Sequence, residues 1–481
     1  MSNINELKPE KVFKYFNEIS QIPRGSDDEK GVSDYLTKFG KDRNLETIQE
    51  PCLNVIIKKP ATPGYEHIPA VILQGHMDMV CVKTEGSNHD FLKDPIELWV
   101  DGDFLRAKET TLGADNGIAV AMALAILDSN DLQHPALEVL CTIAEETGMD
   151  GAGNLNPANI SGKTLINIDS EEEGTLLASC AGGVNNIVSL PIVWEKAQKD
   201  VYKKLTIKGL LGGHSGIEII KNRANAIKLM ARVLRALEGL NIEVTAVSGG
   251  EKMNAITKFC HATIGFDAAS SDAVEAKLKE MEGIFQNEFA AADPGIFFEF
   301  NAVENPAKVY SNKTLTQFVN FLRLLPNGVQ TMNHVIKGLV ESSNNIGVLE
   351  TKEDVIMMNN AVRSSVKSLK AELNDRIKIL AELNGATSEL VADYPEWAFQ
   401  IESPIRDLMK SVYMEMTGKE LLVDAIHAGL ECGLLTEKVG NIDMVSLGPN
   451  LYDVHTPEEK LSISSTERVY TFLVEVLKKM A

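Results

Sequence analysis

The sequence contains no apolar run close to the roughly 20 residues that a helix needs to cross a bilayer, so no membrane span is expected. Its first eight residues, MSNINELK, also lack the apolar segment of a secretory signal. The six cysteines include no Cys-x-x-Cys pair, which favours reduced thiols over a disulfide framework or a thiolate zinc site. Together these absences predict a soluble, cytoplasmic protein.

Positive charge is also scarce, with 47 Lys and Arg against 68 Asp and Glu and a net charge of −21. Such an acidic chain is not expected to bind nucleic acid or an anionic membrane, because no basic face could easily outweigh the negative charge. A hydrophobic content of 44% and a charged content of 24% are typical of a soluble globular protein. A length of 481 residues predicts two or three domains.

Helical and strand patterns alternate over roughly the first 180 residues. Amphipathic helices are expected at residues 11–20 and 28–39, and a helix apolar on nearly every position at 117–127. β-rich runs occur at 54–57, 70–73, 138–143 and 164–168. This alternation predicts a layered α/β domain.

The pattern changes near Val184, where a second set of strands and an amphipathic helix lead into a polar, small-residue stretch. The α/β pattern resumes near Ala398. We therefore predict an α/β domain with a mixed sheet in two sequence halves, residues 1–184 and 398–481, and an α+β domain inserted at 185–397.

Acidic residues and histidines follow several of the expected strands and turns. They are His76 and Asp78, Asp115 in a glycine-bracketed turn, Glu145 and Glu146, Asp169 with the acidic run 171–173, and His455. The carboxyl ends of strands in an α/β sheet converge on one crevice, so these groups are expected to meet. Each alone could be a surface turn, a helix cap or a solvated acidic loop, but an ordered series of five favours one site.

Imidazoles together with carboxylates form a donor set that suits two divalent ions of the zinc or manganese type. A carboxylate shared between two such ions, about 3.5–4 Å apart, is typical of hydrolytic sites that activate a water. Without cations, so many carboxylates would repel one another or take up protons. The sequence therefore predicts a two-metal hydrolytic centre.

The motifs as a set resemble those of the zinc-dependent M20 metallopeptidases, and within them the branch of cytosolic non-specific dipeptidases. They span most of the chain: GHMDMV at 75–80, TTLGADNGIAVA at 110–121, AEETGMDGA at 144–152, LINIDSEEEG at 165–174, GLLGGHSG at 209–216, HAGLECG at 427–433 and the turn at His455. Many M20 relatives have a lysine after the motif of the bridging aspartate, whereas this chain has Asp115-Asn116-Gly117, which is similar to the dipeptidase branch.

The resemblance implies a role for each residue of the metal centre. His76 and Asp169 would hold one metal, Glu146 and His455 the other, and Asp115 would bridge both. Glu171 or Glu172 could compete with Asp169 for its role. Asp78 would orient His76, and Glu145 would act as the general base.

The inserted domain resembles the family's lid. By resemblance, His214 would donate a hydrogen bond to the oxyanion, reaching the site of a partner subunit, and Arg363 would bind the substrate's terminal carboxylate. Asn254 and Gly429 are weaker candidates for the same carboxylate pocket.

We therefore expect a cytoplasmic, homodimeric dipeptidase with two Zn²⁺ per subunit, for which Co²⁺ or Mn²⁺ could substitute. Its expected substrates are unblocked dipeptides, with Xaa-His and β-alanyl-histidine among them. An aminoacylase, deacetylase or tripeptidase on the same fold is the enzyme alternative, and a metal-binding scaffold without activity is the alternative of another class.

Overall fold

The chain forms two compact units in the computed structural model, which describes residues 4–440 and 442–481. Unit 1 comprises Met1–Cys180, Trp397–Ala425 and Leu430–Ala481. Unit 2 comprises Ala181–Glu396 and Ile426–Gly429. The short segment Ile426–Gly429, which the sequence pattern places with the second α/β half, clusters with unit 2.

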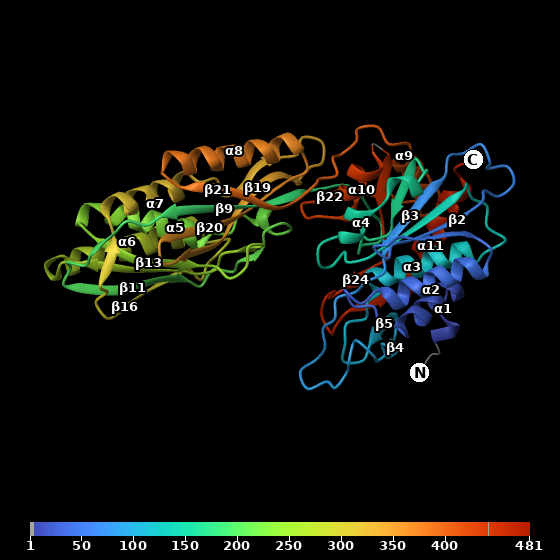
Figure 1. The fold of residues 1–481 in the computed structure, drawn as a ribbon, viewed down its shortest axis with the longest axis horizontal. Coiled ribbons are helices and arrows are strands. Elements are labelled where there is room, and N and C mark those ends of the chain that lie inside the picture. Colours follow the sequence, from blue (N-terminus) through green and yellow to red (C-terminus); the bar gives the residue numbers. More distant parts are fainter. Residues whose placement is uncertain (1–3, 441) are drawn as a thin grey trace. The chain divides into compact units, whose positions relative to one another are not determined.

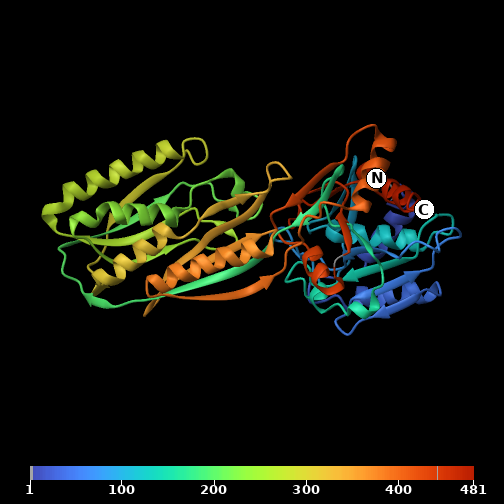
Figure 2. The same cartoon turned by 90° about the horizontal axis from the view of Figure 1, so that it is seen from above.

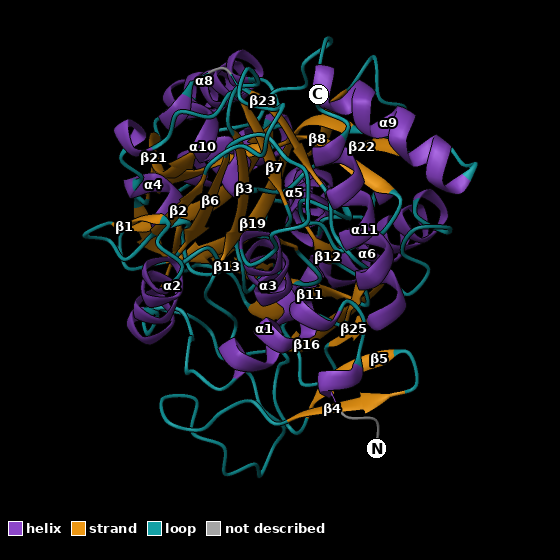
Figure 3. Ribbon diagram, turned by 90° about the vertical axis from the view of Figure 1, so that its right-hand side faces the viewer, coloured by secondary structure: helices purple, strands orange, loops and turns teal. Residues whose placement is uncertain are grey.

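Unit 1 is built on an eight-stranded mixed sheet in the order β1-β2-β6-β3-β7-β23-β8-β22. The bounds of its strands are β1 Glu46–Gln49, β2 Val55–Lys59, β3 Val71–His76, β6 Leu137–Thr142, β7 Thr164–Asn167, β8 Thr175–Cys180, β22 Leu422–Ile426 and β23 Asp443–Ser446. Strands β6, β3, β7 and β23 are parallel neighbours (Figure 3). Every residue of β3 and β6 is buried. Strands buried on both faces appear in a sequence as continuous apolar runs, as these do.

The helices of unit 1 are α1 Glu10–Ser20, α2 Lys30–Asp42, α3 Ala114–Leu127, α4 Asp150–Asn154, α9 Pro404–Thr417, α10 Glu431–Val439 and α11 Ile463–Lys478. Helix α3 packs on both β3 and α1, and every residue in it except Asp115 is buried. A helix that is apolar on all sides is stable in water only when it is enclosed in this way. Gly113, at φ 67°, provides the left-handed backbone turn that begins α3.

A smaller antiparallel sheet in unit 1 has the order β24-β25-β5-β4. Its strands are β4 Leu98–Asp101, β5 Phe104–Ala107, β24 Leu451–Tyr452 and β25 Lys460–Ser462. Residues 453–459, which connect β24 to β25, form the loop that contains His455.

Unit 2 contains a nine-stranded antiparallel sheet in the order β16-β11-β15-β13-β19-β20-β9-β21, with β18 paired to β19. Its strands are β9 Gly182–Pro191, β11 Val201–Lys208, β13 Glu243–Gly249, β15 Cys260–Phe266, β16 Phe297–Ala302, β18 Gly328–Met332, β19 Val340–Thr351, β20 Val355–Ser364 and β21 Thr387–Tyr394. Two small ladders pair β10 Trp194–Lys196 with β17 Lys308–Tyr310, and β12 Gly213–His214 with β14 Ala255–Ile256.

Four helices of unit 2 lie along one face of this sheet (Figures 1 and 2). They are α5 Ala226–Leu237, α6 Ser271–Glu288, α7 Asn312–Leu324 and α8 Lys367–Leu383. Their apolar faces and the covered face of the sheet form one hydrophobic core, separate from that of unit 1.

The predicted α/β class with a mixed sheet is confirmed. None of the helices in residues 4–440 and 442–481 combines the length and the apolar character needed to cross a membrane.

Candidate metal centre

Three parallel strands of unit 1 end at the same edge of the sheet, and each delivers an acidic or imidazole side chain there. Strand β3 ends at His76, Glu145 and Glu146 follow β6, and Asp169 follows β7. The order β6-β3-β7 places β3, with His76 at its end, between the other two strands.

Asp115 lies between two histidines and presents a different carboxylate oxygen to each. Its Oδ1 is 3.2 Å from His76 Nε2, and its Oδ2 is 3.2 Å from His455 Nε2. Burial would raise the pKa of Asp115, but the hydrogen bonds from His455 and His76 hold that pKa below its usual value. One carboxylate between two imidazole nitrogens is the arrangement that a bridging ligand requires.

Each histidine also faces a second carboxylate. His76 Nε2 is 3.5 Å from Asp169 Oδ1, and His455 Nε2 is 3.0 Å from Glu146 Oε2. The ligand atoms of His76, Asp115 and Glu146 all lie within 4.8 Å of one another. The five predicted ligands therefore form two overlapping groups that share Asp115.

The carboxylates of this cluster are crowded and largely enclosed. Burial raises the pKa of Asp169 to about 6, and the nearby Asp115 adds to the rise. Glu171 is also close enough to be affected, since burial followed by Asp115 and Asp169 raises its pKa to about 7. Of Asp169 and Glu171, Asp169 is the residue whose carboxylate lies within 4 Å of His76 Nε2.

This donor set fits divalent cations. Neutral imidazole nitrogens and carboxylate oxygens are the ligands that zinc takes in open, catalytic sites. Cations would also neutralise the crowded carboxylates, which otherwise take up protons at a cost in free energy.

Glu145 lies beside the predicted ligands without being one of the closest groups. Its Oε2 is 3.9 Å from His76 Nε2, and burial raises its pKa well above the usual value. The preceding Ala144 has φ 52°, a left-handed conformation that is rare outside glycine, and its N–H donates to Glu29 Oε1 at 3.1 Å. This sharp turn lets two consecutive glutamates occupy different positions.

Asp78 is completely buried and orients three parts of the site. It accepts a hydrogen bond from His76 Nδ1 at 3.1 Å, which leaves Nε2 of that ring available as a ligand. It also accepts the backbone N–H groups of Glu145 at 3.2 Å and Glu146 at 3.3 Å, and the Ser26 hydroxyl at 2.8 Å.

Glu459 supports the site, although no feature of the sequence suggested a role for it. Its carboxylate accepts the backbone N–H groups of four consecutive residues, Leu112, Gly113, Ala114 and Asp115, at 2.7, 3.0, 2.8 and 3.3 Å. It comes from the same loop as His455, so one loop supplies a predicted ligand and also holds the turn that carries Asp115.

Glu431 lies at the start of α10 and is fully buried behind the strand ends. Its carboxylate accepts hydrogen bonds from Gln74 Nε2 at 2.6 Å and from Thr142 Oγ1 at 2.7 Å. Gln74 Oε1 in turn accepts a hydrogen bond from Asn167 Nδ2 at 2.6 Å. The network ties together the ends of β3, β6 and β7. The HAGLECG motif contains Glu431, but the sequence reasoning selected only Gly429 from it.

Replacing Glu459 with alanine is expected to lower the free energy of unfolding by at least about 2 kcal/mol, because buried N–H groups lose a charged acceptor. The Glu459→Ala variant should also bind metal more weakly, since the Asp115 turn loses its support. Urea unfolding and metal titration measure the two effects. The control is Glu458→Ala, which removes the exposed neighbouring carboxylate. Equal urea midpoints for the two variants would contradict the proposed support.

His214, Arg363, Asn254 and Gly429 all lie in unit 2. His214 Nδ1 accepts the backbone N–H groups of Gly216 and Ile217, both at 3.2 Å, so the ring proton is on Nε2. Burial, assisted by Arg363, lowers the pKa of His214, which favours the neutral ring. His214 is thus prepared to donate one hydrogen bond from Nε2.

The other three residues of unit 2 differ in their surroundings. Arg363, on β20, donates from Nη1 to Tyr394 Oη at 2.8 Å, while its buried Nε has no partner in the described chain. The Asn254 side chain is exposed, and its backbone carbonyl accepts the N–H of Ser215 at 2.9 Å. Gly429 is partly buried and follows His427, whose Nε2 lies 2.7 Å from Ser343 Oγ.

Comparison with known proteins gives matches over the whole chain. The sequence is 36% identical over 482 residues to the cytosol non-specific dipeptidase of Escherichia coli K12, covering 100% of this chain and 99% of that protein. The profile of the peptidase dimerisation domain of the M20 group matches residues 205–293, within unit 2.

Solved structures give a consistent result. The structure of an aminoacylhistidine dipeptidase from Vibrio alginolyticus matches with a TM-score of 0.95 and 35% identity, covering 100% of this chain and 98% of that one. The aminopeptidase PepT from Bacillus cereus matches with a TM-score of 0.57 and 15% identity over 98% of both chains, a likeness of fold alone.

Proposed function

The chain belongs to the M20 family of metallopeptidases, and on that premise we propose that it is a dipeptidase acting on unblocked dipeptides of broad side-chain character. The family resemblance inferred from the motifs is thereby confirmed, as is the assignment as a peptide-bond hydrolase. The observation that carries the proposal is Asp115 between His76 and His455, with Glu145 beside them.

In the proposed centre, His76 and Asp169 would hold one divalent cation, Glu146 and His455 would hold a second, and Asp115 would be shared by both. Zn²⁺ is the expected ion, with Co²⁺ or Mn²⁺ as substitutes. When bound, such a pair supplies a polarised scissile carbonyl and a water that ionises near neutral pH. Asp78 keeps the His76 ring in the orientation that presents Nε2.

Glu145 is the proposed general base. It removes a proton from the attacking water and then passes that proton to the nitrogen of the departing amine, so that one water is consumed for each peptide bond broken. A carboxylate with a raised pKa accepts the proton more readily than an ordinary glutamate, and the enclosed position of Glu145 gives it that property. The neighbouring Glu146 retains its separate contact with His455.

The proposed substrates are unblocked dipeptides, including Xaa-His and β-alanyl-histidine. Arg363 is the proposed partner of the terminal carboxylate, because a guanidinium binds a carboxylate through two parallel hydrogen bonds. Asn254 and Gly429 are proposed to contribute to the same carboxylate pocket. The Vibrio relative is an aminoacylhistidine dipeptidase, which supports histidine-containing dipeptides as the first to be tested.

A panel of substrates tests this proposal. The purified protein is expected to hydrolyse Ala-His, β-alanyl-histidine and Leu-Gly, and to be slower by at least about tenfold on N-acetylated amino acids and on tripeptides. The increase in free amino groups on hydrolysis, measured by a ninhydrin or fluorescamine assay, gives the rates. Activity confined to the acetylated set would instead identify an aminoacylase or deacetylase.

We further propose that the protein is a cytoplasmic homodimer, supported by the match to a dimerisation domain and by the cytosolic relative. His214 is proposed to donate from Nε2 to the oxygen that becomes negative during attack, in the site of a partner subunit. The His214→Ala variant should then lose roughly 10²–10³-fold in kcat, with little change in the midpoint of thermal unfolding.

Mixing His214→Ala with Glu145→Ala tests whether the site is shared between subunits. If His214 acts in the partner's site, a mixed dimer contains one site with both Glu145 and His214. Part of the activity should therefore return after subunit exchange. Formation of mixed dimers must be shown independently, for example by mass analysis of differently tagged subunits. If mixed dimers form and are no more active than the two variants alone, His214 acts in its own subunit.

A further inference from the structure

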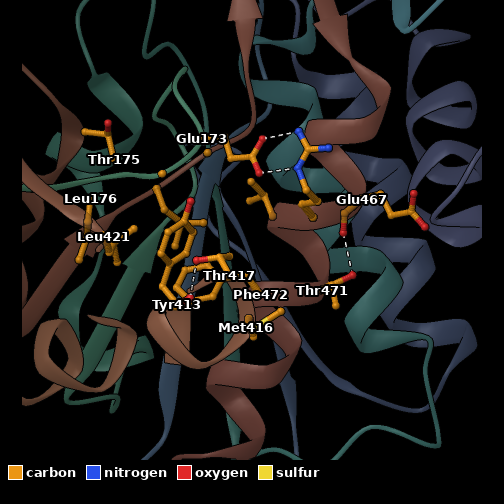
Figure 4. A pocket seen from close by; sticks show the side chains of 15 residues that line it. Glu173, Thr175, Leu176, Tyr413, Met416, Thr417, Leu421, Glu467, Thr471 and Phe472 are labelled. Atoms are coloured by element: carbon orange, nitrogen blue, oxygen red, sulfur yellow. Dashed lines mark hydrogen bonds and ion pairs between the residues drawn. The ribbon is translucent and has the colours of Figure 1, made fainter. Parts of the chain in front are cut away.

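A cavity of about 340 Å³ lies in unit 1 between α9, α11 and the start of β8 (Figure 4). Its apolar walls are the side chains of Leu176, Tyr413, Met416, Leu421, Val469 and Phe472. This volume is in the range of sites that bind small molecules. Met416 and Thr417, both exposed, connect the cavity to the surface.

The charged groups at this cavity leave no unpaired charge directed into it. Arg468 donates to both carboxylate oxygens of Glu173, from Nε at 2.6 Å and from Nη2 at 2.7 Å. The carboxylate of Glu467 points away from the cavity (Figure 4). Because a buried unpaired charge is costly, an apolar cavity of this kind favours an uncharged ligand over a zwitterionic dipeptide or amino acid.

The walls also favour an aromatic ligand with one polar group. The rings of Tyr413 and Phe472 meet edge to face, 5.4 Å apart at 83°, and Met416 provides a thioether close to them. Within the described residues, the Tyr413 hydroxyl makes no hydrogen bond. It is therefore free to bond to a single hydroxyl, carbonyl or ring N–H of the ligand.

We propose that this cavity is a regulatory site for a small uncharged aromatic molecule with one hydrogen-bonding group, and that its occupation acts on the segment that carries Asp169. The binding half of this proposal is independent of the proposed function. The regulatory half rests on the role proposed for Asp169 in holding metal.

The cavity and Asp169 are joined by a short stretch of chain, residues 169–174. At its far end, Gly174 has φ +84° and lies so close to the Tyr413 hydroxyl that an added Cβ would be 3.0 Å from it. A ligand bonded to that hydroxyl therefore lies next to the Gly174 backbone. Only four residues separate Gly174 from Asp169.

A second connection runs through the loop after β23. The Ser170 N–H donates to the carbonyl of Leu447 at 3.2 Å, and Ser170 Oγ is 2.8 Å from Ser446 Oγ. Leu447 and Gly448 also line the cavity. A Cβ on Gly448 would lie 1.6 Å from the Ser170 carbonyl oxygen, so the two loops are packed backbone to backbone. A change at the cavity wall is therefore transmitted directly to the neighbour of Asp169.

Calorimetric titration of the metal-loaded protein with p-cresol and with indole tests the binding. Thr417→Phe, which places a ring at the cavity mouth, should weaken binding at least tenfold. Ser411→Phe adds the same ring to an exposed position of α9 that does not line the cavity, and it should bind as wild type does. Tyr413→Phe should weaken p-cresol binding by about 2–12-fold, the value of one ordinary hydrogen bond. If wild type gives no heat of binding with either ligand, or if Thr417→Phe binds p-cresol as tightly as wild type does, the proposed binding site is wrong.

Zinc retention tests the regulatory half without relying on turnover. In a competition against a chromophoric chelator, saturating p-cresol should change the zinc affinity of wild type and Ser411→Phe by about fivefold or more, the lower end of typical couplings between sites. The affinity of Thr417→Phe should not respond. Binding of p-cresol with no change in zinc affinity would overturn the coupling, while failure of the proposed dipeptidase activity would leave this readout intact.

Discussion

The Glu145→Ala variant is expected to retain its metal while its kcat falls by roughly 10²–10⁴-fold, the range that follows loss of a general base. Glu145 is 3.9 Å from His76 and makes none of the close contacts between the predicted ligands, so its removal should leave those contacts in place. Glu145→Gln keeps the shape of the side chain but cannot take up the proton, and it should be about equally slow. Steady-state kinetics and elemental analysis on the same preparation measure both effects.

Glu97→Ala is a suitable control, since it removes an exposed glutamate whose partner is Lys108. It should behave as wild type does. A Glu145→Ala enzyme close to full activity would show that another group removes the proton. A wild-type protein that binds metal but cleaves no member of the substrate panel would instead favour the inactive metal-binding scaffold.

Asp115→Ala is expected to lose metal from both positions together and to be less active by roughly a thousandfold or more. The reason is that its two oxygens face His76 and His455 separately, and among residues 4–440 and 442–481 it is the one carboxylate within 4 Å of both imidazoles. Loss of metal assistance removes several kcal/mol of transition-state stabilisation, and each 1.36 kcal/mol is a factor of ten in rate. Elemental analysis should show fewer ions per chain, and prior treatment of wild type with a chelator should reproduce the loss, reversibly on adding Zn²⁺.

Asp42→Ala is the control for this experiment, because Asp42 is an exposed aspartate at the end of α2 and is paired with Lys38. It should retain both metal and activity. His76→Ala provides a useful contrast, since it should affect mainly the group that contains Asp169. An Asp115→Ala protein with full metal content, or a wild-type enzyme indifferent to chelator, would refute the bridging role.

The part of the fold that the sequence predicted well is the part whose side chains are apolar. Strands β3 and β6 are buried throughout, so each appears in the sequence as an apolar run ending in polar groups. Helix α3 was equally clear, because nearly all of its positions are apolar. In these elements the buried positions are the apolar positions of the sequence. Because the strands could be located in this way, the polar residues that follow them could be expected to lie close together.

Strands β19 and β20 were harder to predict because their buried positions include several asparagines. Asn344 is buried and donates to the Pro326 carbonyl at 2.8 Å, and Asn360 donates to the Asn186 carbonyl at 3.1 Å. Such bonds remove the cost of burying an amide. Their partners are distant in sequence, so a local pattern shows only a polar stretch rich in small residues.

The same limitation applies to the supporting groups of the candidate site. His76, Asp115 and Glu145 lie in motifs that resemble a known family, whereas Glu459 and Arg24 do not. Arg24 is buried and donates from Nη1 to the Met77 and Asp78 carbonyls, both at 3.1 Å. An acidic or basic residue is usually exposed, so only the folded structure identifies the backbone groups that these two residues serve.

The interrupted course of unit 1 affects how the protein is made. Its first segment ends at Cys180, and the segments that complete it begin only at Trp397, after about 200 residues of unit 2 have been added. At ordinary rates of translation this insertion takes roughly 10–40 s. During that interval the nascent chain has His76, Asp115 and Glu146 but neither His455 nor Glu459, so the proposed metal centre cannot be complete until unit 2 and the loop at 453–459 have been synthesised.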